Sequence, residues 1–350
     1  MSSQQSFTFQ DPYETDPYEQ QFSLGVQYEF APNYLLEVGY AGTKGTHLIG
    51  SVGVNQPLFA SVSSPVNGIT TNTVENASLR VPFQGLSPTT GVSEFISGFD
   101  SNYNSLQVSL TKRFSHGFQF TSAYTFGKVL DDLGTGSGVF LSSGGVSGDQ
   151  HDLSQAKGPA DFDRKNRLVF SAIWQLPNTT RASSFARLVA NGWEVAGLLT
   201  LQSGLPLTIT DSAAATIYAG NSRAQFAPGM SAADAVLSGP VTGRLNEYFN
   251  TSAFTSAPPI GDGTGFGNSG RGILRGPDQR NLDFALMRRF RVSKLGEAGD
   301  LEFRAESFNL TNTPSFGNPG TDRAAPSSFG VITSTSINPR ILQLALKVSF

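Results

Sequence analysis

Acidic side chains and histidines are the residues of this sequence that could hold a metal ion. Six aspartates flank one long unpatterned stretch: Asp131, Asp132, Asp149, Asp152, Asp161 and Asp163. Ca²⁺ takes carboxylate oxygens as ligands, but this spacing follows no known calcium loop, so solvated carboxylates are the favoured interpretation. The histidines are His47, His116 and His151, and none of them has a second histidine or a carboxylate at metal-site spacing. We therefore predict no metal centre.

A glycine-rich motif is the second pattern that could carry chemistry. Residues 265–270 read Gly-Phe-Gly-Asn-Ser-Gly and fit the G-x-G-x-x-G pattern of dinucleotide-binding loops. That pattern binds phosphates where a strand leads into it and a helix follows it, and the sequence predicts neither here. We interpret the motif as a loop, and we predict no cofactor, no catalytic residue and no enzyme activity.

Polar residues at every second position could line a water-filled path. Glu302, Arg304 and Glu306 alternate in this way, and we expect their opposite charges to pair with one another rather than to form a ligand site. The candidate lumen-lining residues are Glu37, Gln107, Gln202, Glu302, Arg304 and Glu306. Ligand capture is expected in the long loops, where binding residues are disproportionately found.

Strands with a period of two must position these side chains. Residues 342–350 alternate Leu, Leu, Leu, Val and Phe with polar or small residues. Successive side chains of a strand point to opposite faces, which suits a strand between lipid and a wet lumen. The end of this strand is predicted to act as a membrane-assembly signal through Leu346, Val348 and Phe350.

The same alternation recurs in pairs of segments along the chain. The pairs are 22–30 with 34–41, 106–111 with 118–126, 168–176 with 193–201, and 282–286 with 301–303. The two segments of the first pair, of about ten residues each, match the length of tilted transmembrane strands. With the last strand, the sequence predicts an all-β fold of about nine antiparallel strands.

The connections alternate in length. Short or modest turns are expected at Pro32, His116, Pro177 and Gly296. Long Gly-, Ser-, Thr-, Pro- and Asn-rich stretches lie near 43–102, 132–163, 212–278 and 318–338, and they far exceed the typical connection of about 4–6 residues. Short turns on one side and long loops on the other predict a transmembrane β-barrel with periplasmic turns and extracellular loops.

Aromatic residues near strand ends support the membrane interpretation. Barrels in the outer membrane carry aromatic girdles at both membrane surfaces. The candidate interfacial aromatics are Tyr34, Tyr40, Trp174 and Trp193.

Composition excludes several classes of protein. The net charge is −3 and no basic block is present, so the sequence has no electrostatic footprint for nucleic acid. Cysteine is absent, which excludes disulfides and thiolate metal sites. No stretch approaches the roughly 20 apolar residues of a transmembrane helix. The first residues lack the basic and apolar regions of a signal peptide, so we expect the chain to be a fragment of a longer protein.

Several longer segments resemble one family when they are taken in order. These segments are 15–27, 36–48, 158–168, 248–254, 266–271, 274–277 and 303–312. Among them are Gly-Pro-Ala-Asp-Phe-Asp-Arg at 158–164 and Phe-Arg-Ala-Glu-Ser-Phe-Asn-Leu-Thr-Asn at 303–312. Together they resemble the carboxy-terminal barrel of TonB-dependent outer-membrane receptors, in the Oar-like branch that carries a carboxypeptidase-regulatory-like front domain.

This resemblance implies a location, a partner set and a function. It implies an outer-membrane transporter with a plugged barrel of about 22 strands. Residues 1–19 are expected to form an extended segment and 20–350 the carboxy-terminal part of the barrel, without plug or earlier strands. The implied partners are outer-membrane lipid, the barrel-assembly machinery, the TonB complex through a plug domain, and an unidentified small-molecule, glycan or peptide ligand.

Two other functions stay open at this point. The main alternative is a soluble or surface-attached β-sandwich that binds a partner without transport, although such a sandwich would show a charged outer face and only 15% of residues are charged. A passive porin is the weaker alternative.

Overall fold

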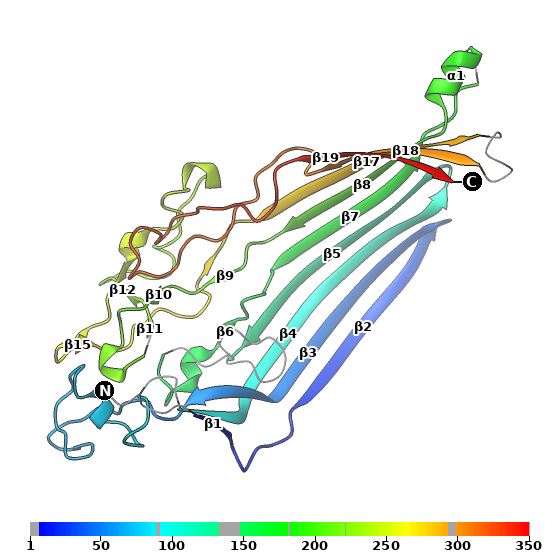
Figure 1. Cartoon of the computed structure of the whole chain (residues 1–350). Helices are drawn as coiled ribbons and strands as arrows, with labels where there is room; N and C mark the ends of the chain where they lie inside the picture. Colours follow the sequence, from blue (N-terminus) through cyan, green and yellow to red (C-terminus); the bar gives the residue numbers. More distant parts are fainter. Residues whose placement is uncertain are drawn as a thin grey trace.

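One large sheet dominates the structure. The computed structural model describes residues 7–88, 92–132, 148–180, 183–220, 222–292 and 299–349. Within these ranges, a path of nine long strands forms the sheet, and each strand is antiparallel to its neighbours. In spatial order they are β19 (Ile341–Ser349), β18 (Asp300–Phe308), β17 (Gln279–Arg291), β8 (Trp193–Gln202), β7 (Asn166–Gln175), β5 (Phe118–Asp131), β4 (Val92–Ser115), β3 (Tyr34–Gly53) and β2 (Tyr18–Ala31). We call these nine strands the wall (Figure 1).

The wall confirms the predicted number of strands and corrects the length of two. The prediction placed a loop over 43–102, but β3 continues to Gly53 and β4 begins at Val92, and their pairing runs out to Gly53 opposite Ser93. The apolar alternation stops before this extension, which is why the sequence did not show it. Val52 and Phe99 are buried there against Ala156, so packing against a loop stabilises the extra pairing.

Two of the turns at one end of the wall are short. Asn33 in the β2–β3 turn and His116 in the β4–β5 turn both have left-handed backbones, at φ 71° and 54°. The modest turn predicted at Pro177 is wrong, because this connection contains helix α1 (Ser184–Ala190). Seven residues are too short to give a clear helical period in sequence. The turn predicted at Gly296 lies outside the described residues.

Long loops gather at the other end and form a second layer. We call segments 54–88, 148–165, 203–278 and 309–340 the cap. Its short strands are β6 (Gly158–Pro159), β9 (Pro206–Leu207), β10 (Thr210–Asp211), β11 (Ser222–Arg223), β12 (Gln225–Phe226), β13 (Phe254–Thr255), β14 (Pro259–Ile260), β15 (Gly263–Thr264) and β16 (Leu274–Arg275). Its 3₁₀ helices span Ala77–Leu79, Leu153–Ala156, Thr216–Tyr218, Val241–Gly243 and Thr251–Ala253. Strand β1 (Phe7–Gln10) pairs in parallel with β4. No helix among the described residues is long and apolar enough to cross a bilayer.

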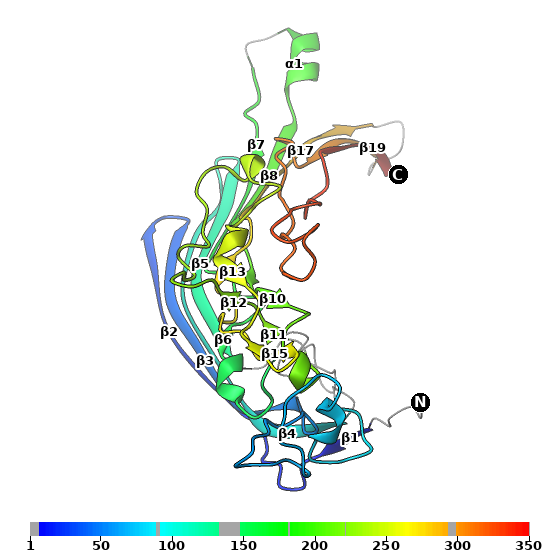
Figure 2. The ribbon, with the colours of Figure 1, turned by 90° about the vertical axis from the view of Figure 1, so that its left-hand side faces the viewer.

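The cap has a hydrophobic core of its own. Phe249 is 1% exposed and makes edge-to-face contacts with Phe254 and Phe329, at 6.0 and 5.2 Å between ring centroids. Ile209 and Leu274 are buried in the same cluster. Figure 2 shows the wall as a curved sheet with the cap on its hollow side. The long loops are therefore a packed layer and not loose connections.

Gly204 lies where the two ends of cap segment 203–278 pass close to each other. A Cβ atom at Gly204 would lie 1.8 Å from the carbonyl oxygen of Gly276. We expect Gly204→Ala to force the two ends of this segment apart and to lower the free energy of unfolding by about 1–3 kcal/mol, measured by denaturant unfolding. Gly25→Ala is the matched control, because a Cβ at Gly25 meets nothing within 4 Å. An equal loss in both variants would contradict this account.

Candidate functional site

The pairing register gives the wall one polar face. Directly paired residues of neighbouring strands lie on the same face, so faces can be traced across the sheet. Glu37 on β3 pairs with Ser109 on β4. Two residues further along β3, Gly39 pairs with Gln107, and Gln107 also pairs with Thr125 on β5, so these residues share a face. The six candidate lumen residues all lie on this face: Glu37, Gln107, Gln202, Glu302, Arg304 and Glu306. We call it the polar face. Whether it lines a lumen stays a prediction.

Charged residues on the polar face form a ladder near the short turns. Glu302 lies directly opposite Arg289, and their side chains are 3.0 Å apart. Arg304 contacts Glu302 at 3.1 Å and Glu306 at 3.4 Å. The alternation predicted this pairing of opposite charges. Because Arg289 is 67% exposed, solvent screens its pair with Glu302, and this pair adds little to stability. The ladder therefore makes this part of the polar face charged, and it contributes little to the stability of the fold.

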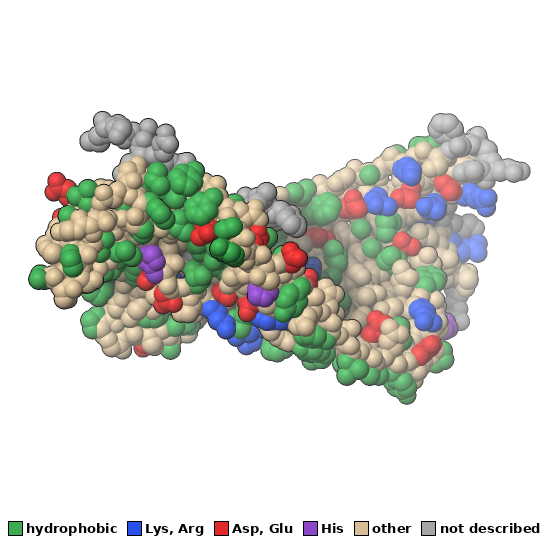
Figure 3. Space-filling view, turned by 90° about the horizontal axis from the view of Figure 1, so that it is seen from below, with side chains coloured by type: hydrophobic (Ala, Val, Ile, Leu, Met, Phe, Trp, Pro, Cys, Tyr) green, Lys and Arg blue, Asp and Glu red, His purple; other side chains and the backbone are tan. Residues whose placement is uncertain are grey.

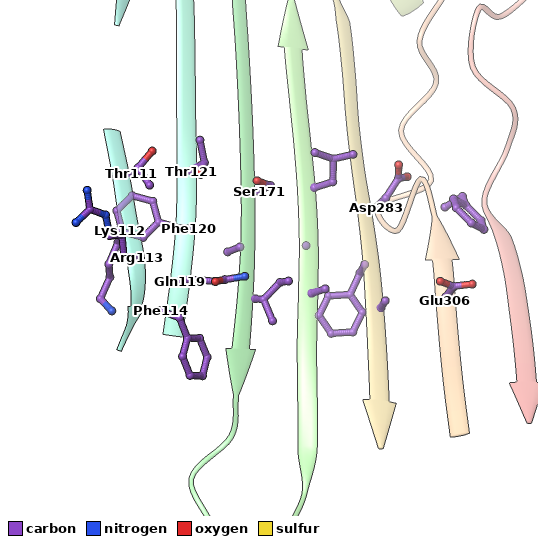
Figure 4. Close-up of a pocket in the computed structure, with 18 residues that line it drawn as sticks. Thr111, Lys112, Arg113, Phe114, Gln119, Phe120, Thr121, Ser171, Asp283 and Glu306 are labelled. Carbon is purple, nitrogen blue, oxygen red and sulfur yellow. The ribbon is translucent and has the colours of Figure 1, made fainter. Parts of the chain in front are cut away.

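A groove of about 640 Å³ runs along the polar face. Figure 4 shows its labelled side chains coming from a row of adjacent strands. Its polar-face hydroxyl, amide and carboxylate groups belong to Thr111, Gln119, Thr121, Ser171, Asp283 and Glu306. Leu198, Ile173 and Phe308 add apolar surface. The groove can thus offer hydrogen bonds and apolar contact to the same molecule.

Asp283 is a groove residue that sequence analysis missed. Its Oδ1 accepts a hydrogen bond of 2.8 Å from the backbone N–H of Asn309, where the cap segment 309–340 leaves β18. On the same face, the Gln279 side-chain amide donates to Ser336 Oγ over 3.1 Å. The cap is therefore attached to the polar face itself. The sequence did contain a signal for Asp283. It lies between Leu282 and Phe284, so the alternation of a strand alone places its side chain on the face opposite to these two apolar residues.

Buried ion pairs hold the cap segments together. Arg271, whose side chain is 6% exposed, pairs with Asp131 at the end of β5 and lies 3.7 Å from Asp161. Asp163 pairs with Arg275, and it also accepts the backbone N–H of Val129 at 2.7 Å.

These contacts correct the prediction of solvated aspartates for two residues. Asp131 and Asp163 are buried, at 9% and 1% exposure. Their arginine partners lie more than 100 positions further along the chain, so no local pattern could show the pairs. No cluster of three or more His, Cys, Asp or Glu that could hold a metal is found among the described residues. The motif at 265–270 lies in a loop, as expected.

Arg80 joins two further parts of the cap. Its guanidinium is fully buried, donates to the carbonyl oxygens of Leu58 and Ile217, and donates through Nε to Asn76 Oδ1 at 2.8 Å. Burial lowers the pKa of this guanidinium, but the carbonyl partners keep its donors satisfied. Segment 54–88 is thus fixed to segment 203–278. The cap is one connected body above the polar face.

The opposite face of the wall is apolar and exposed. Across the central strands, Leu199 pairs with Phe170 and with Leu282. Large apolar side chains exposed on this face include Leu24, Val26, Val38, Leu106, Phe126, Leu342 and Leu344. We call it the apolar face. An exposed apolar surface of this extent marks contact with lipid or with another protein. Figure 3 shows acidic and basic side chains interspersed around the hollowed end of the molecule.

The candidate interfacial aromatics lie at two levels. Tyr34, Trp174 and Trp193 are at or next to the strand ends on the short-turn side. Tyr40 lies six residues along β3 from Tyr34, about 20 Å further at the usual rise of a strand. Its hydroxyl donates a hydrogen bond to Asn104 Oδ1 on the neighbouring strand β4. Asparagines occupy positions 102 and 104 of that strand, and the apolar alternation begins at Leu106. Their role as girdles stays a prediction.

The predicted assembly signal is described in part. Leu346 and Val348 lie on the apolar face opposite Phe303 and Leu301, and both are exposed. Phe350 lies outside the described residues. Whether these side chains direct membrane assembly stays a prediction.

Comparisons with known proteins give the family. The solved structures similar to the chain include the outer membrane transporter YddB from Escherichia coli, at 11% identity and a TM-score of 0.49, over 99% of this chain and 34% of that one. Another is the pyoverdine outer membrane receptor FpvA from Pseudomonas aeruginosa PAO1 bound to pyoverdine, at 10% identity and a TM-score of 0.44, over 95% of this chain and 30% of that one. The chain thus spans about a third of the length of these structures. No curated protein matches it.

A family model supplies the decisive match. The model of the outer membrane beta barrel domain matches residues 1–343, almost the whole chain. The two faces of the wall are those that such a domain requires, with apolar side chains toward lipid and polar side chains toward the interior. The chain belongs to the outer membrane beta barrel domain family and is a protein of the bacterial outer membrane.

Proposed function

We propose that the chain forms the wall of a TonB-dependent receptor of the Oar-like branch, and that its polar face lines the path of an actively imported solute. One observation carries the proposal: a grooved polar face on the hollow side of the wall, attached to a cap of packed loops. A cap held by buried ion pairs can present a fixed surface to a solute from outside. The polar face then offers hydroxyl, amide and carboxylate groups along the way inward.

Strand parity supports a larger barrel. Eight antiparallel pairings separate β2 from β19, so these two edge strands run in the same direction. An antiparallel ring with an even number of strands therefore needs an odd number of further strands between them. About 13 more would give the roughly 22 strands of plugged transporters. A second copy of the chain cannot complete such a ring, because β19 of one copy would lie parallel to β2 of the other when both are inserted in the same direction.

The proposed roles follow from this arrangement. Outer-membrane lipid covers the apolar face, and the barrel-assembly machinery inserts the strands. The solute is a small molecule, glycan or peptide that meets the cap first. Energy reaches the path through a plug domain that contacts TonB. The chain itself has no catalytic role in this scheme.

Energy-dependent uptake tests the proposal. A strain without the gene, and the same strain with the gene restored, would be fed a panel of labelled metal chelates, glycans and peptides. We expect at least one solute to be taken up only by the restored strain, and a protonophore to abolish that uptake. Uptake that persists with the protonophore would favour the passive porin, and no difference over the panel would count against any transport role.

The β-sandwich alternative does not fit the fold. A sandwich buries the apolar faces of two sheets against each other. In the described residues, the apolar face of the wall has no second sheet packed on it, and Leu24, Leu342 and Leu344 are each more than 70% exposed. That surface matches a lipid environment.

A further inference from the structure

Helix α1 leaves the wall on the apolar side. The carbonyl oxygen of Val189, in the last turn of α1, accepts a hydrogen bond of 2.8 Å from Trp193 Nε1 and another of 2.8 Å from Arg288 Nη1. Trp193 and Arg288 are paired neighbours on β8 and β17, and their side chains belong to the apolar face. The carboxy-terminal end of α1 is therefore fixed at the lipid-facing edge of the wall and not at the polar face.

The attachment point is an aromatic and basic cluster at the strand ends. The Arg288 guanidinium lies 5.3 Å from the ring centroid of Trp193 and 4.1 Å from that of Phe290. Trp193 also contacts Phe303 edge-on at 6.3 Å. Tryptophan, phenylalanine and an arginine whose stem lies along apolar surface are typical of the boundary between acyl chains and head groups. The cluster places the base of α1 at that depth.

The helix exposes apolar side chains at this boundary. Phe185 is 76% exposed and Val189 is 51% exposed, and residues four apart lie on the same side of a helix. Figure 1 shows α1 standing beyond the ends of β7 and β8. A short helix with an apolar side would bury that side only where it meets a further apolar surface, and the surface continuous with its base is the lipid-covered face of the wall.

We propose that α1 is an interfacial helix, and that Phe185 and Val189 insert into the leaflet on the short-turn side of the outer membrane. The helix anchors the β7–β8 hairpin to lipid and fixes the depth of the wall at that surface. Interfacial helices bury an apolar face about 5–10 Å into the head-group and acyl boundary. This role is independent of any transported solute.

Spin labels can locate the helix because the chain has no cysteine. Single variants Phe185→Cys and Val189→Cys of the full chain would carry a nitroxide after insertion into phosphatidylethanolamine and phosphatidylglycerol vesicles. Power saturation with oxygen, which concentrates in lipid, and with a nickel chelate, which stays in water, then reports depth. We expect both labels to be more accessible to oxygen than to nickel.

Two control labels make the outcome decisive. His116→Cys, in the exposed β4–β5 turn at the same end, is expected to favour nickel. Leu199→Cys, on the apolar face, is expected to favour oxygen. If Leu199 reports lipid while Phe185 and Val189 report water, the interfacial helix is disproved and its apolar side is free for a periplasmic protein. Water contact at Leu199 as well would overturn the inference together with the insertion of the wall.

Discussion

Leu199→Arg is expected to destabilise the inserted wall by about 2–4 kcal/mol, whereas Leu198→Arg is expected to leave it within about 1 kcal/mol of the unmodified chain. An arginine near the middle of the lipid-facing surface of a barrel costs about 2–4 kcal/mol. That loss is equivalent to roughly 30-fold or more in the folding equilibrium, at about 1.4 kcal/mol per factor of ten.

The two leucines are neighbours of the same type on opposite faces. Leu199 lies between Phe170 and Leu282 on the apolar face. Leu198 is 41% exposed on the polar face, between Ser171 and Asp283. An arginine at 198 would meet water and a carboxylate, and an arginine at 199 would meet lipid. The two substitutions have the same size and almost the same position along β8, so a difference between them reports only the face to which the side chain points.

Folding into vesicles gives the measurement. Each variant would be refolded into lipid vesicles and titrated with urea, and the folded fraction followed by the change in electrophoretic mobility of unheated samples. Equal losses at 198 and 199 would show that the two faces do not differ in environment, and would contradict a lipid-facing wall. A loss at 198 alone would mean that the faces are reversed.

Period-two patterns are local, so the sequence predicted the wall well. Alternation assigned Leu199 to the lipid side, and it assigned Glu302, Arg304 and Glu306 to one opposite face without any knowledge of their partners. A strand carries this information within its own ten or so residues. The extensions of β3 and β4 escaped prediction because the apolar alternation of these strands ends before the extensions begin.

The cap could not be predicted in the same way. Its stability depends on pairs such as Arg271 with Asp131 and on the contact of Arg80 with Ile217, which join residues more than 100 positions apart. Composition showed only that these segments are rich in glycine and polar residues, which is equally typical of loose loops. Helix α1 was missed for a different reason. Its structure depends on local sequence, but seven residues are too few to show a helical period.

Removal of Arg271 should give the largest effect in the cap. Arg271→Met leaves Asp131 buried without its partner, and breaking a buried pair in this way costs about 3–5 kcal/mol. We expect amide hydrogens of segments 203–278 and 148–165 to exchange much faster, while those of the wall keep their protection, since local opening follows local stability. Hydrogen exchange followed by mass spectrometry would separate the two regions.

Two matched variants decide whether the buried charge is the cause. Arg289→Met removes an arginine that is 67% exposed from its pair with Glu302, and it is expected to leave the free energy of unfolding nearly unchanged. The double variant Arg271→Met with Asp131→Asn removes both charges, so it should lose less than Arg271→Met alone. If the double variant is no more stable than the single one, the loss comes from the hydrogen bond to the Ala156 carbonyl oxygen and the ion pair with Asp161, and not from the unpaired carboxylate of Asp131.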